Sequence, residues 1–230
     1  MIQIAASMMC ADQLELRREL QRLEEAKVDL LHCDVMDGLY VPNMAMSYSM
    51  LEQIRQFTSI PLDIHLMIVE PERYLNQFAD LQPGYISIHA EAATHLHRAV
   101  QMIKKRGIRA AVALNPSTPL SHIEYVLAEL DMVLIMTVDP GYAGQKFIPA
   151  MIEKIRELKK ISLKKKPDLL IQVDGNINGQ TIPPAVAAGA NILVGGTASI
   201  FKGPEADYKK LVQDMRVSAM LGGHEYESVS

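Results

Sequence analysis

Residues 85–114 read YISIHAEAATHLHRAVQMIKKRGIRAAVAL and contain one complete repeat of the pattern that decides the fold. The stretch opens with YISIHA and closes with RAAVAL, two apolar runs typical of buried strands. Between them, HLHRAVQMIKKRG has apolar residues at helical spacing, and Gly107 stands where a helix would end before the next strand. A strand, a helix and a second strand in this order predict a parallel pair joined by a right-handed crossover.

The same alternation continues along the whole chain. The predicted strands are the apolar runs IQIAAS from Ile2, LLHCDVM from Leu30, LDIHLMI from Leu62, YISIHA from Tyr85, RAAVALN from Arg109, MVLIMTV from Met132, LLIQVDG from Leu169 and NILVGG from Asn191. The predicted helices are the amphipathic stretches 14–26, 49–57, 72–81, 95–107, 120–130, 150–162, 181–190 and 205–221. Asp12 is the expected N-cap of the first helix.

Eight such units in 230 residues predict a single-domain TIM (β/α)₈ barrel, a fold that takes about 250 residues. We place the barrel at residues 1–222 and a frayed polar tail at 223–230. An open doubly wound sheet is the alternative, but it normally carries a glycine-rich dinucleotide turn after its first strand. The corresponding residues 6–12, ASMMCAD, contain no glycine.

Composition excludes several classes of protein. With 49% hydrophobic and 22% charged residues the chain is globular rather than disordered, and a net charge of −4 argues against a nucleic-acid partner. Two cysteines, Cys10 and Cys33, are too few for a disulfide framework. We see no targeting segment and no apolar run near the ~20 residues of a membrane span. A cytoplasmic location and no membrane partner are therefore expected.

Four ionisable residues stand on otherwise apolar predicted strands. His32 and Asp34 are two residues apart and so share one strand face, while His65 and Asp174 lie on other strands. A single histidine here would be better explained as a hydrogen-bonded core residue, but four such groups are costly to bury unless they pair or bind metal. Two imidazoles and two carboxylates predict a divalent metal site for Zn²⁺, Mn²⁺, Fe²⁺ or Co²⁺, with Mg²⁺ less suited.

Asp34 and Asp174 also form a candidate acid/base pair. Two carboxylates on opposite faces of a substrate can remove a proton from one side and return one to the other. That exchange inverts a carbon next to a carbonyl, and a metal on the enediolate oxygens would stabilise the developing charge.

Glycines follow the last three predicted strands, at Gly141 and Gly144, at Gly175, and at Gly195–Gly196. Backbone N–H groups in such turns can face an anion, and many barrels bind phosphate after strands seven and eight. Each glycine alone is explained equally well by turn geometry. Together they predict a phosphorylated substrate, with Lys146 as a solvent-exposed neighbour of the phosphate.

Other residues near these strand ends have weaker signals. Met36, Met67 and Met136 are either core filler or lining of the site. Cys33 faces away from His32 and is expected to pack in the core, and His89 is expected to be structural or to support the site. No lysine stands in a predicted strand, which argues against Schiff-base chemistry.

Taken together, these motifs resemble the ribulose-phosphate 3-epimerase family along nearly the whole chain. The matching pieces are ASMMCAD, LLHCDVMDGLYVPN, LDIHLMI, LNPSTP, MTVDPGYAGQKFIP, IQVDGNIN and LVGGTA, in the family's order. The resemblance implies a metal-dependent epimerase of ketose phosphates that is a homo-oligomer, a dimer or a hexamer. It places the metal on His32, Asp34, His65 and Asp174, with Asp34 as proton acceptor and Asp174 as proton donor.

The resemblance also implies the substrate contacts. These are Ser7, His65, Asp174, Gly141, Tyr142, Ala143, Gly144, Gly175, Asn176, Gly196 and Thr197, with Met36, Met67 and Met136 beside the reacting carbon. Pentulose-phosphate members usually have glycine in place of Asn176, often glycine in place of Ala143, and commonly histidine in place of Leu39. These departures, with S-x-M-C and V-G-x-T, are closer to the D-allulose-6-phosphate 3-epimerase branch.

The favoured substrate is accordingly D-allulose 6-phosphate, converted to D-fructose 6-phosphate, and the alternative is D-ribulose 5-phosphate, converted to D-xylulose 5-phosphate. Two other classes are weighed against an epimerase. A phosphosugar isomerase or decarboxylase would not need both carboxylates together with both histidines. A sugar-phosphate binding protein would have no use for a metal-linked acid/base pair.

Overall fold

The eight apolar runs form the parallel strands of a closed barrel in the computed structural model, which describes residues 2–227. The barrel strands are β1 (Gln3–Ser7), β2 (Leu30–Asp37), β4 (Leu62–Met67), β5 (Tyr85–His89), β6 (Arg109–Leu114), β7 (Met132–Met136), β8 (Leu170–Asp174) and β9 (Ile192–Gly195). Each pairs with its neighbours in this order, and the pairing of β9 with β1 closes the ring. The predicted TIM barrel is confirmed.

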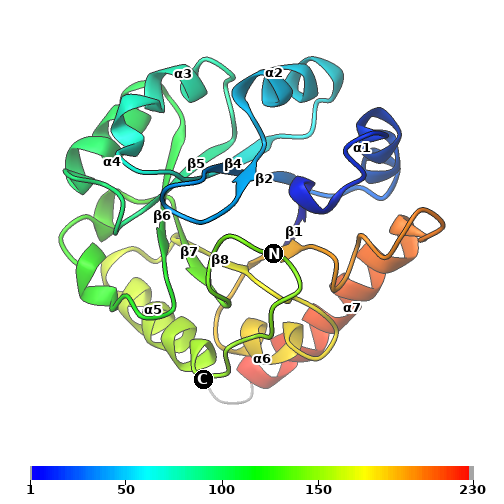
Figure 1. Cartoon of the computed structure of the whole chain (residues 1–230). Helices are drawn as coiled ribbons and strands as arrows, with labels where there is room; N and C mark the ends of the chain where they lie inside the picture. The colour runs from blue at the N-terminus through cyan, green and yellow to red at the C-terminus, as the bar shows by residue number, and fades with distance from the viewer. Residues whose placement is uncertain (1, 228–230) are drawn as a thin grey trace.

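Helices surround the strands as an outer ring (Figure 1). The α-helices are α1 (Leu16–Glu25), α2 (Tyr48–Phe57), α3 (Leu75–Ala79), α4 (Leu96–Lys105), α5 (Met151–Lys165), α6 (Ile182–Ala187) and α7 (Tyr208–Glu227). Short 3₁₀ turns are η1 (Met8–Cys10), η2 (Pro71–Arg73), η3 (Leu120–Ile123) and η4 (Leu127–Glu129). The apolar faces of this ring pack against the outward side chains of the strands and form the main core.

Two of the predicted helices differ from this arrangement. Residues 120–130 form η3 and η4 rather than one α-helix, and residues 72–81 divide between η2 and α3. In the first stretch, Ile123, Tyr125 and Val126 have modest helix propensity and stand near its middle. Ile123 and Leu127 are nevertheless buried, each only 1% exposed, so two short turns satisfy the same apolar spacing.

The start of α1 also differs from the prediction. Asp12 does not cap the helix, which begins at Leu16 with Glu15 at the N-cap position. The Asp12 carboxylate instead accepts a hydrogen bond from the backbone N–H of Leu14 at 3.0 Å. Such a local turn competes with helix initiation, and it leaves the Leu14 side chain 94% exposed.

A short strand that the sequence did not predict extends β2. Strand β3 (Met44–Ala45) pairs antiparallel with the end of β2, and residues 38–43 connect the two. Asp37 orders this connection, because its carboxylate accepts from the backbone N–H groups of Leu39 at 2.8 Å and Tyr40 at 2.9 Å. The hairpin lies beside the mouth of the barrel, next to the carboxyl end of β2.

Side chains facing the lumen form layers of different chemistry. One end of the barrel is filled by apolar residues, Ala5, Leu30, Tyr85, Ala111, Met132, Ile192 and Val194. Nearer the carboxyl ends of the strands, His32 and Asp34 point inward while Cys33 packs in the outer core, as predicted. The apolar layer closes the barrel beneath these charged groups, so they can meet solvent only through the mouth.

Helix α7 continues through Glu227, past residue 222, where we placed the end of the barrel. Residues 223–227 of the predicted tail belong to this helix, and residues 228–230 lie outside the described residues. Among the described residues, no helix combines the length and apolar character needed to cross a bilayer. The expected cytoplasmic location stays a prediction.

Candidate active site

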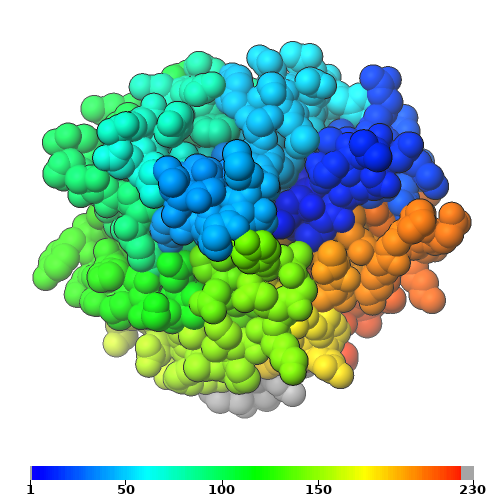
Figure 2. Space-filling view, in the orientation of Figure 1, coloured from blue at the N-terminus to red at the C-terminus, as the bar shows by residue number. Residues whose placement is uncertain are grey.

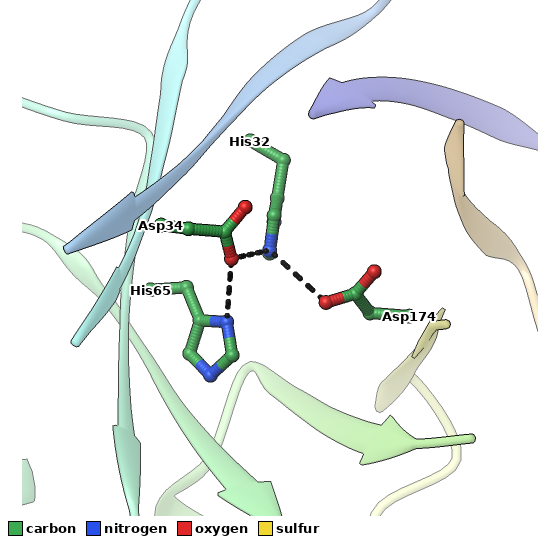
Figure 3. A group of neighbouring side chains, drawn as sticks. All are labelled: His32, Asp34, His65 and Asp174. Atoms are coloured by element: carbon green, nitrogen blue, oxygen red, sulfur yellow. Dashed lines mark hydrogen bonds and ion pairs between the residues drawn. The ribbon is translucent and has the colours of Figure 1, made fainter. Parts of the chain in front are cut away.

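Three buried side chains and the half-buried side chain of Asp174 converge at the carboxyl end of the barrel lumen. His32 and Asp34 come from β2, His65 from β4 and Asp174 from β8 (Figure 3). One donor atom from each lies within 4.8 Å of every other, so the structure brings together the four residues that we predicted as metal ligands. Parallel pairing explains part of this, because Asp34 lies opposite His65 in the β2–β4 register.

Asp34 is the centre of the cluster. Its Oδ1 lies 3.3 Å from His32 Nε2 and 3.2 Å from His65 Nδ1. Its Oδ2 accepts a hydrogen bond of 3.0 Å from the Ser7 hydroxyl. Asp174 approaches from the other side, with Oδ2 3.7 Å from His32 Nε2. The two carboxylates therefore face each other across a narrow space, with the imidazoles beneath.

His32 is oriented by a second carboxylate deeper in the lumen. Its Nδ1 lies 2.7 Å from Asp63 Oδ2, which also accepts from Gln172 Nε2 at 2.5 Å. With the hydrogen on Nδ1, the lone pair of Nε2 faces the cluster, and this buried nitrogen has no hydrogen-bond partner among the described residues. An unpaired buried nitrogen beside two carboxylates fits a cation-binding site.

A cleft of about 600 Å³, continuous with solvent, opens above the cluster. Its lining includes most of the predicted substrate contacts: Ser7, Gly141, Tyr142, Ala143, Gly144, Asp174, Gly175, Asn176, Gly196 and Thr197, as well as Met36, Met67 and Met136. His32 and His65 are fully buried and do not line it. His65, predicted also as a substrate contact, therefore lies below the floor rather than on it.

Two loops meet over the mouth of the cleft. Asn43, in the β2–β3 connection, donates from Nδ2 to the carbonyl of Gly141 at 2.7 Å. The Tyr142 hydroxyl donates to the carbonyl of Pro42. Figure 2 shows these segments in contact at the centre of the face that looks down the barrel. The contact joins the loop after β7 to the hairpin after β2.

Comparison with known proteins identifies the family. Residues 3–201 match the model of the ribulose-phosphate 3 epimerase family. This chain belongs to that family. It is 46% identical over 219 residues to the ribulose-phosphate 3-epimerase of Bacillus subtilis, which covers 95% of this chain and 100% of the relative. The ribulose-phosphate 3-epimerase of Methanocaldococcus jannaschii is 43% identical over 220 residues, covering 96% of this chain and 92% of the relative.

Solved structures agree on the fold. A 3-hexulose-6-phosphate synthase from Salmonella typhimurium superposes with a TM-score of 0.71 at 14% identity, over 96% of this chain and 100% of that one. The N-(5'-phosphoribosyl)anthranilate isomerase of Pyrococcus furiosus gives 0.64 at 14% identity, over 96% and 99%. At such identities the likeness shows the barrel alone. Membership of the family rests on the closer sequence relatives. As a member of this epimerase family, the protein is an isomerase.

The electrostatics of the cluster separate its two carboxyl groups. Burial by itself raises the pKa of Asp34, but His32 and His65 beside it hold that pKa well below its usual value. At Asp174, burial raises the pKa, and the nearby Asp34 carboxylate raises it further despite the opposing effect of His32. One carboxyl of the pair is thus held ionised while the other retains a proton more readily.

Several residues of the site had no clear signal in the sequence. Met9, Cys10, Val138, Gln145 and Ala198 also line the cleft. Asp63 and Gln172 support His32, and each occupies a lumen position two residues before a predicted ligand on its strand. Polar residues at alternate positions of an apolar strand were the signal that could have placed Asp63 and Gln172 in the lumen. Lys146 is exposed, as expected.

Proposed function

We propose that this protein interconverts D-ribulose 5-phosphate and D-xylulose 5-phosphate by inverting C3 of the ketose. The observation that carries the proposal is the pair of carboxylates, Asp34 and Asp174, which face each other across the floor of the cleft. Their pKa values are displaced in opposite directions, which suits one group to accept a proton and the other to donate one.

In this mechanism Asp34 removes the C3 proton from one face of the substrate. Asp174 returns a proton to the opposite face, and the roles exchange in the reverse reaction. Ser7 donates to Asp34 Oδ2 and so fixes the orientation of the accepting carboxylate. A divalent cation bound by the cluster would supply positive charge to stabilise the enediolate oxygens.

The donor set suits a transition metal better than Mg²⁺. His32 and His65 offer imidazole nitrogens, and Asp34 and Asp174 offer carboxylate oxygens. Imidazole is a good ligand for Zn²⁺, Fe²⁺ and Co²⁺, and carboxylate adds Mn²⁺, whereas Mg²⁺ prefers oxygen ligands alone. We therefore propose one of these four ions as the cofactor.

The phosphate of the substrate is assigned to the loops after the last strands. Gly175–Asn176 and Gly196–Thr197 follow neighbouring strands, β8 and β9, and both loops line the cleft together with Gly141–Gly144. Many barrels bind phosphate through backbone groups at this position. Such a grip requires no lysine, which agrees with the acidic net charge of the chain.

The choice of a pentulose phosphate replaces the hexulose preference expected from motif detail. The Bacillus subtilis and Methanocaldococcus jannaschii relatives are both named ribulose-phosphate 3-epimerase. Of the three departures that suggested a hexulose, Ala143 and Asn176 line the cleft. Leu39 does not, and its side chain is 76% exposed. The homo-oligomeric state implied by the family stays a prediction.

The first experiment compares kcat/KM for ribulose 5-phosphate and allulose 6-phosphate. We expect the pentulose to be preferred by at least about tenfold, the size of effect that one methylene-sized difference can produce. NMR in D₂O should show deuterium entering at C3 during turnover. A preference for allulose 6-phosphate would overturn the substrate assignment without touching the epimerase chemistry.

The second experiment removes one carboxylate. Asp174→Asn should lower kcat by roughly 10²–10⁴-fold while the melting temperature shows that the barrel remains folded. The matched control is Asp168→Asn, just before the other end of β8 and exposed to solvent, which should keep full activity. If Asp174→Asn retained most of its activity, the two-carboxylate mechanism would be wrong.

A further inference from the structure

His65 has a second buried partner on the side away from the cluster. Its Nε2 lies 2.9 Å from Nε2 of His89, the last residue of β5. Both side chains are fully buried, and the two rings meet edge to edge, with centroids 5.0 Å apart and planes inclined by 28°. Two imidazole nitrogens at this distance share one hydrogen, so one ring must donate and the other must accept.

The chemistry of the cluster decides the direction of this hydrogen bond. His65 presents Nδ1 toward Asp34, and a nitrogen that binds a cation must be free of hydrogen. The hydrogen of a neutral His65 then sits on Nε2 and is donated to His89. His89 must accept with its own Nε2 and therefore carry its hydrogen on Nδ1.

The position of Glu91 favours a hydrogen on Nδ1 of His89. Its Oε2 lies 3.4 Å from His89 Nδ1, and the Glu91 side chain is only 20% exposed. Its other oxygen, Oε1, accepts from the backbone N–H of Asn115 at 2.9 Å and from the Thr118 hydroxyl. Oε2 is thus left for His89, whose Nδ1 is buried without a hydrogen-bond partner among the described residues.

A tyrosine covers this pair of residues. The ring of Tyr40, in the β2–β3 connection, lies 4.7 Å from the His89 ring, centroid to centroid. The Tyr40 hydroxyl accepts from Asn115 Nδ2 at 2.8 Å. The path from Glu91 to His65 is therefore enclosed by protein, which strengthens polar contacts along it.

We propose that His89 and Glu91 are positioning residues that hold the hydrogen of His65 on Nε2 and so direct its Nδ1 lone pair at the cation site. The role parallels that of Asp63, which acts on His32 directly. At His65 the carboxylate acts through an intervening imidazole. This inference rests on the cation site of the proposed function and extends it to two residues that touch neither cation nor substrate.

The direct test is the position of the hydrogens in the Zn²⁺-loaded protein. Long-range ¹⁵N–¹H correlation spectra distinguish protonated from bare imidazole nitrogens, and His→Gln variants assign each ring. We expect His89 to carry its hydrogen on Nδ1 and His65 on Nε2. A His89 hydrogen on Nε2 in the loaded protein would overturn the proposal.

Variants give an independent readout through the affinity for Co²⁺, measured by visible absorption and by chelator competition. His89→Leu removes the acceptor and should weaken Co²⁺ binding by roughly 10–100-fold. His89→Gln retains a side-chain acceptor and should recover much of that affinity. The control is Ser87→Ala on the same strand, which removes a buried hydroxyl without a partner and should bind Co²⁺ as the unmodified protein does.

The outcomes separate the two proposals. If the unmodified protein bound neither Co²⁺ nor Zn²⁺, the cation site itself would be wrong, and the proposed function would fall with this inference. If it bound Co²⁺ and a folded His89→Leu bound it equally well, only the positioning role would be rejected. Circular dichroism establishes folding, and if His89→Leu does not fold, the hydrogen positions in the unmodified protein decide the question.

Discussion

At the scale of single residues, the two carboxylates of the run His32–Gly38 have different roles. Asp34 faces the lumen and is buried among imidazoles, whereas Asp37 lies at the end of the strand and binds backbone N–H groups. One of these N–H groups belongs to Val69, after β4, at 2.8 Å. Burial raises the pKa of Asp37, but these hydrogen bonds together lower it below its usual value. The same motif thus contributes both chemistry and loop order.

Glu91 provides a prediction about stability and pH. Burial raises its pKa, but the His89 imidazole beside it, together with hydrogen bonds from Thr118 and the backbone, lowers it from 4.5 to about 2. Because the folded-state pKa is depressed, the stabilisation is complete above pH 4.5 and disappears as the pH falls toward 2. Glu91→Gln should therefore lose on the order of 2 kcal/mol at pH 7, after allowance for solvent screening, and much less at pH 3.

Urea unfolding at a series of pH values measures this difference. Glu52→Gln on the exposed face of α2 is the control, and its stability should follow that of the unmodified protein throughout. A deficit for Glu91→Gln that stayed constant from pH 7 to pH 3 would show that the charge of Glu91 does not contribute.

At the scale of elements, the ends of β7 and β8 are joined more closely than the ladder alone requires. The Thr137 hydroxyl, just after β7, lies 2.8 Å from the carbonyl of Asp174 and 2.6 Å from that of Gly175. Gly175 has a φ of +123°, and a Cβ at this position would lie 2.6 Å from Val138 Cγ2. Only glycine allows this close approach, which sets the position of Asp174.

Gly175→Ala should therefore destabilise the protein by on the order of 2–4 kcal/mol, through backbone strain and overpacking. It should also lower kcat at least tenfold, because Val138 and the end of β8 must separate. The matched control is Gly107→Ala, whose φ is +74° but whose Cβ would meet nothing within 4 Å. That variant should lose about 1–2 kcal/mol of stability and should keep full activity. If Gly175→Ala and Gly107→Ala lost stability and kcat equally, the contact with Val138 would have no role.

At the scale of the whole molecule, barrel closure brings ionisable side chains of β2, β4 and β8 together above an apolar layer. Two carboxylates and two imidazoles in one largely buried cluster repel or pair imperfectly unless a cation joins them. A ligand that binds only the folded state stabilises it by RT ln(1 + [L]/Kd). The cation should therefore act on the stability of the entire barrel as well as on its chemistry.

A cation at 100 times its Kd stabilises the folded state by about 2.7 kcal/mol, and each kcal/mol raises the melting temperature of a chain of this size by about 2–4 °C. We therefore expect Zn²⁺ or Mn²⁺ at that concentration to raise the melting temperature by about 5–10 °C. A chelator should reverse the shift. His32→Gln should abolish it, whereas His97→Gln, whose side chain is 63% exposed on α4, should retain it. A shift that survived in His32→Gln would place the stabilising cation elsewhere.

The successes and failures of sequence reasoning have identifiable causes. The barrel and the cluster could be predicted because strand periodicity is local and because His32, Asp34, His65 and Asp174 interrupt apolar runs. The Asp12 cap was wrong because a local turn at Asp12 competed with helix initiation. The helix over 120–130 was wrong because two 3₁₀ turns bury the same apolar residues. Strand β3 was missed because a strand of 2 residues has no readable period.

By itself, the sequence determined the fold class, the family and the chemical types at the site, because each depends on residue identity and on short-range spacing. Only the tertiary structure decided which polar groups share one lumen layer: that Asp63 orients His32, that His89 and Glu91 lie behind His65, and that His65 is below the cleft. Those relations depend on strand register and barrel closure, which bring together residues far apart in the chain and have no local signature.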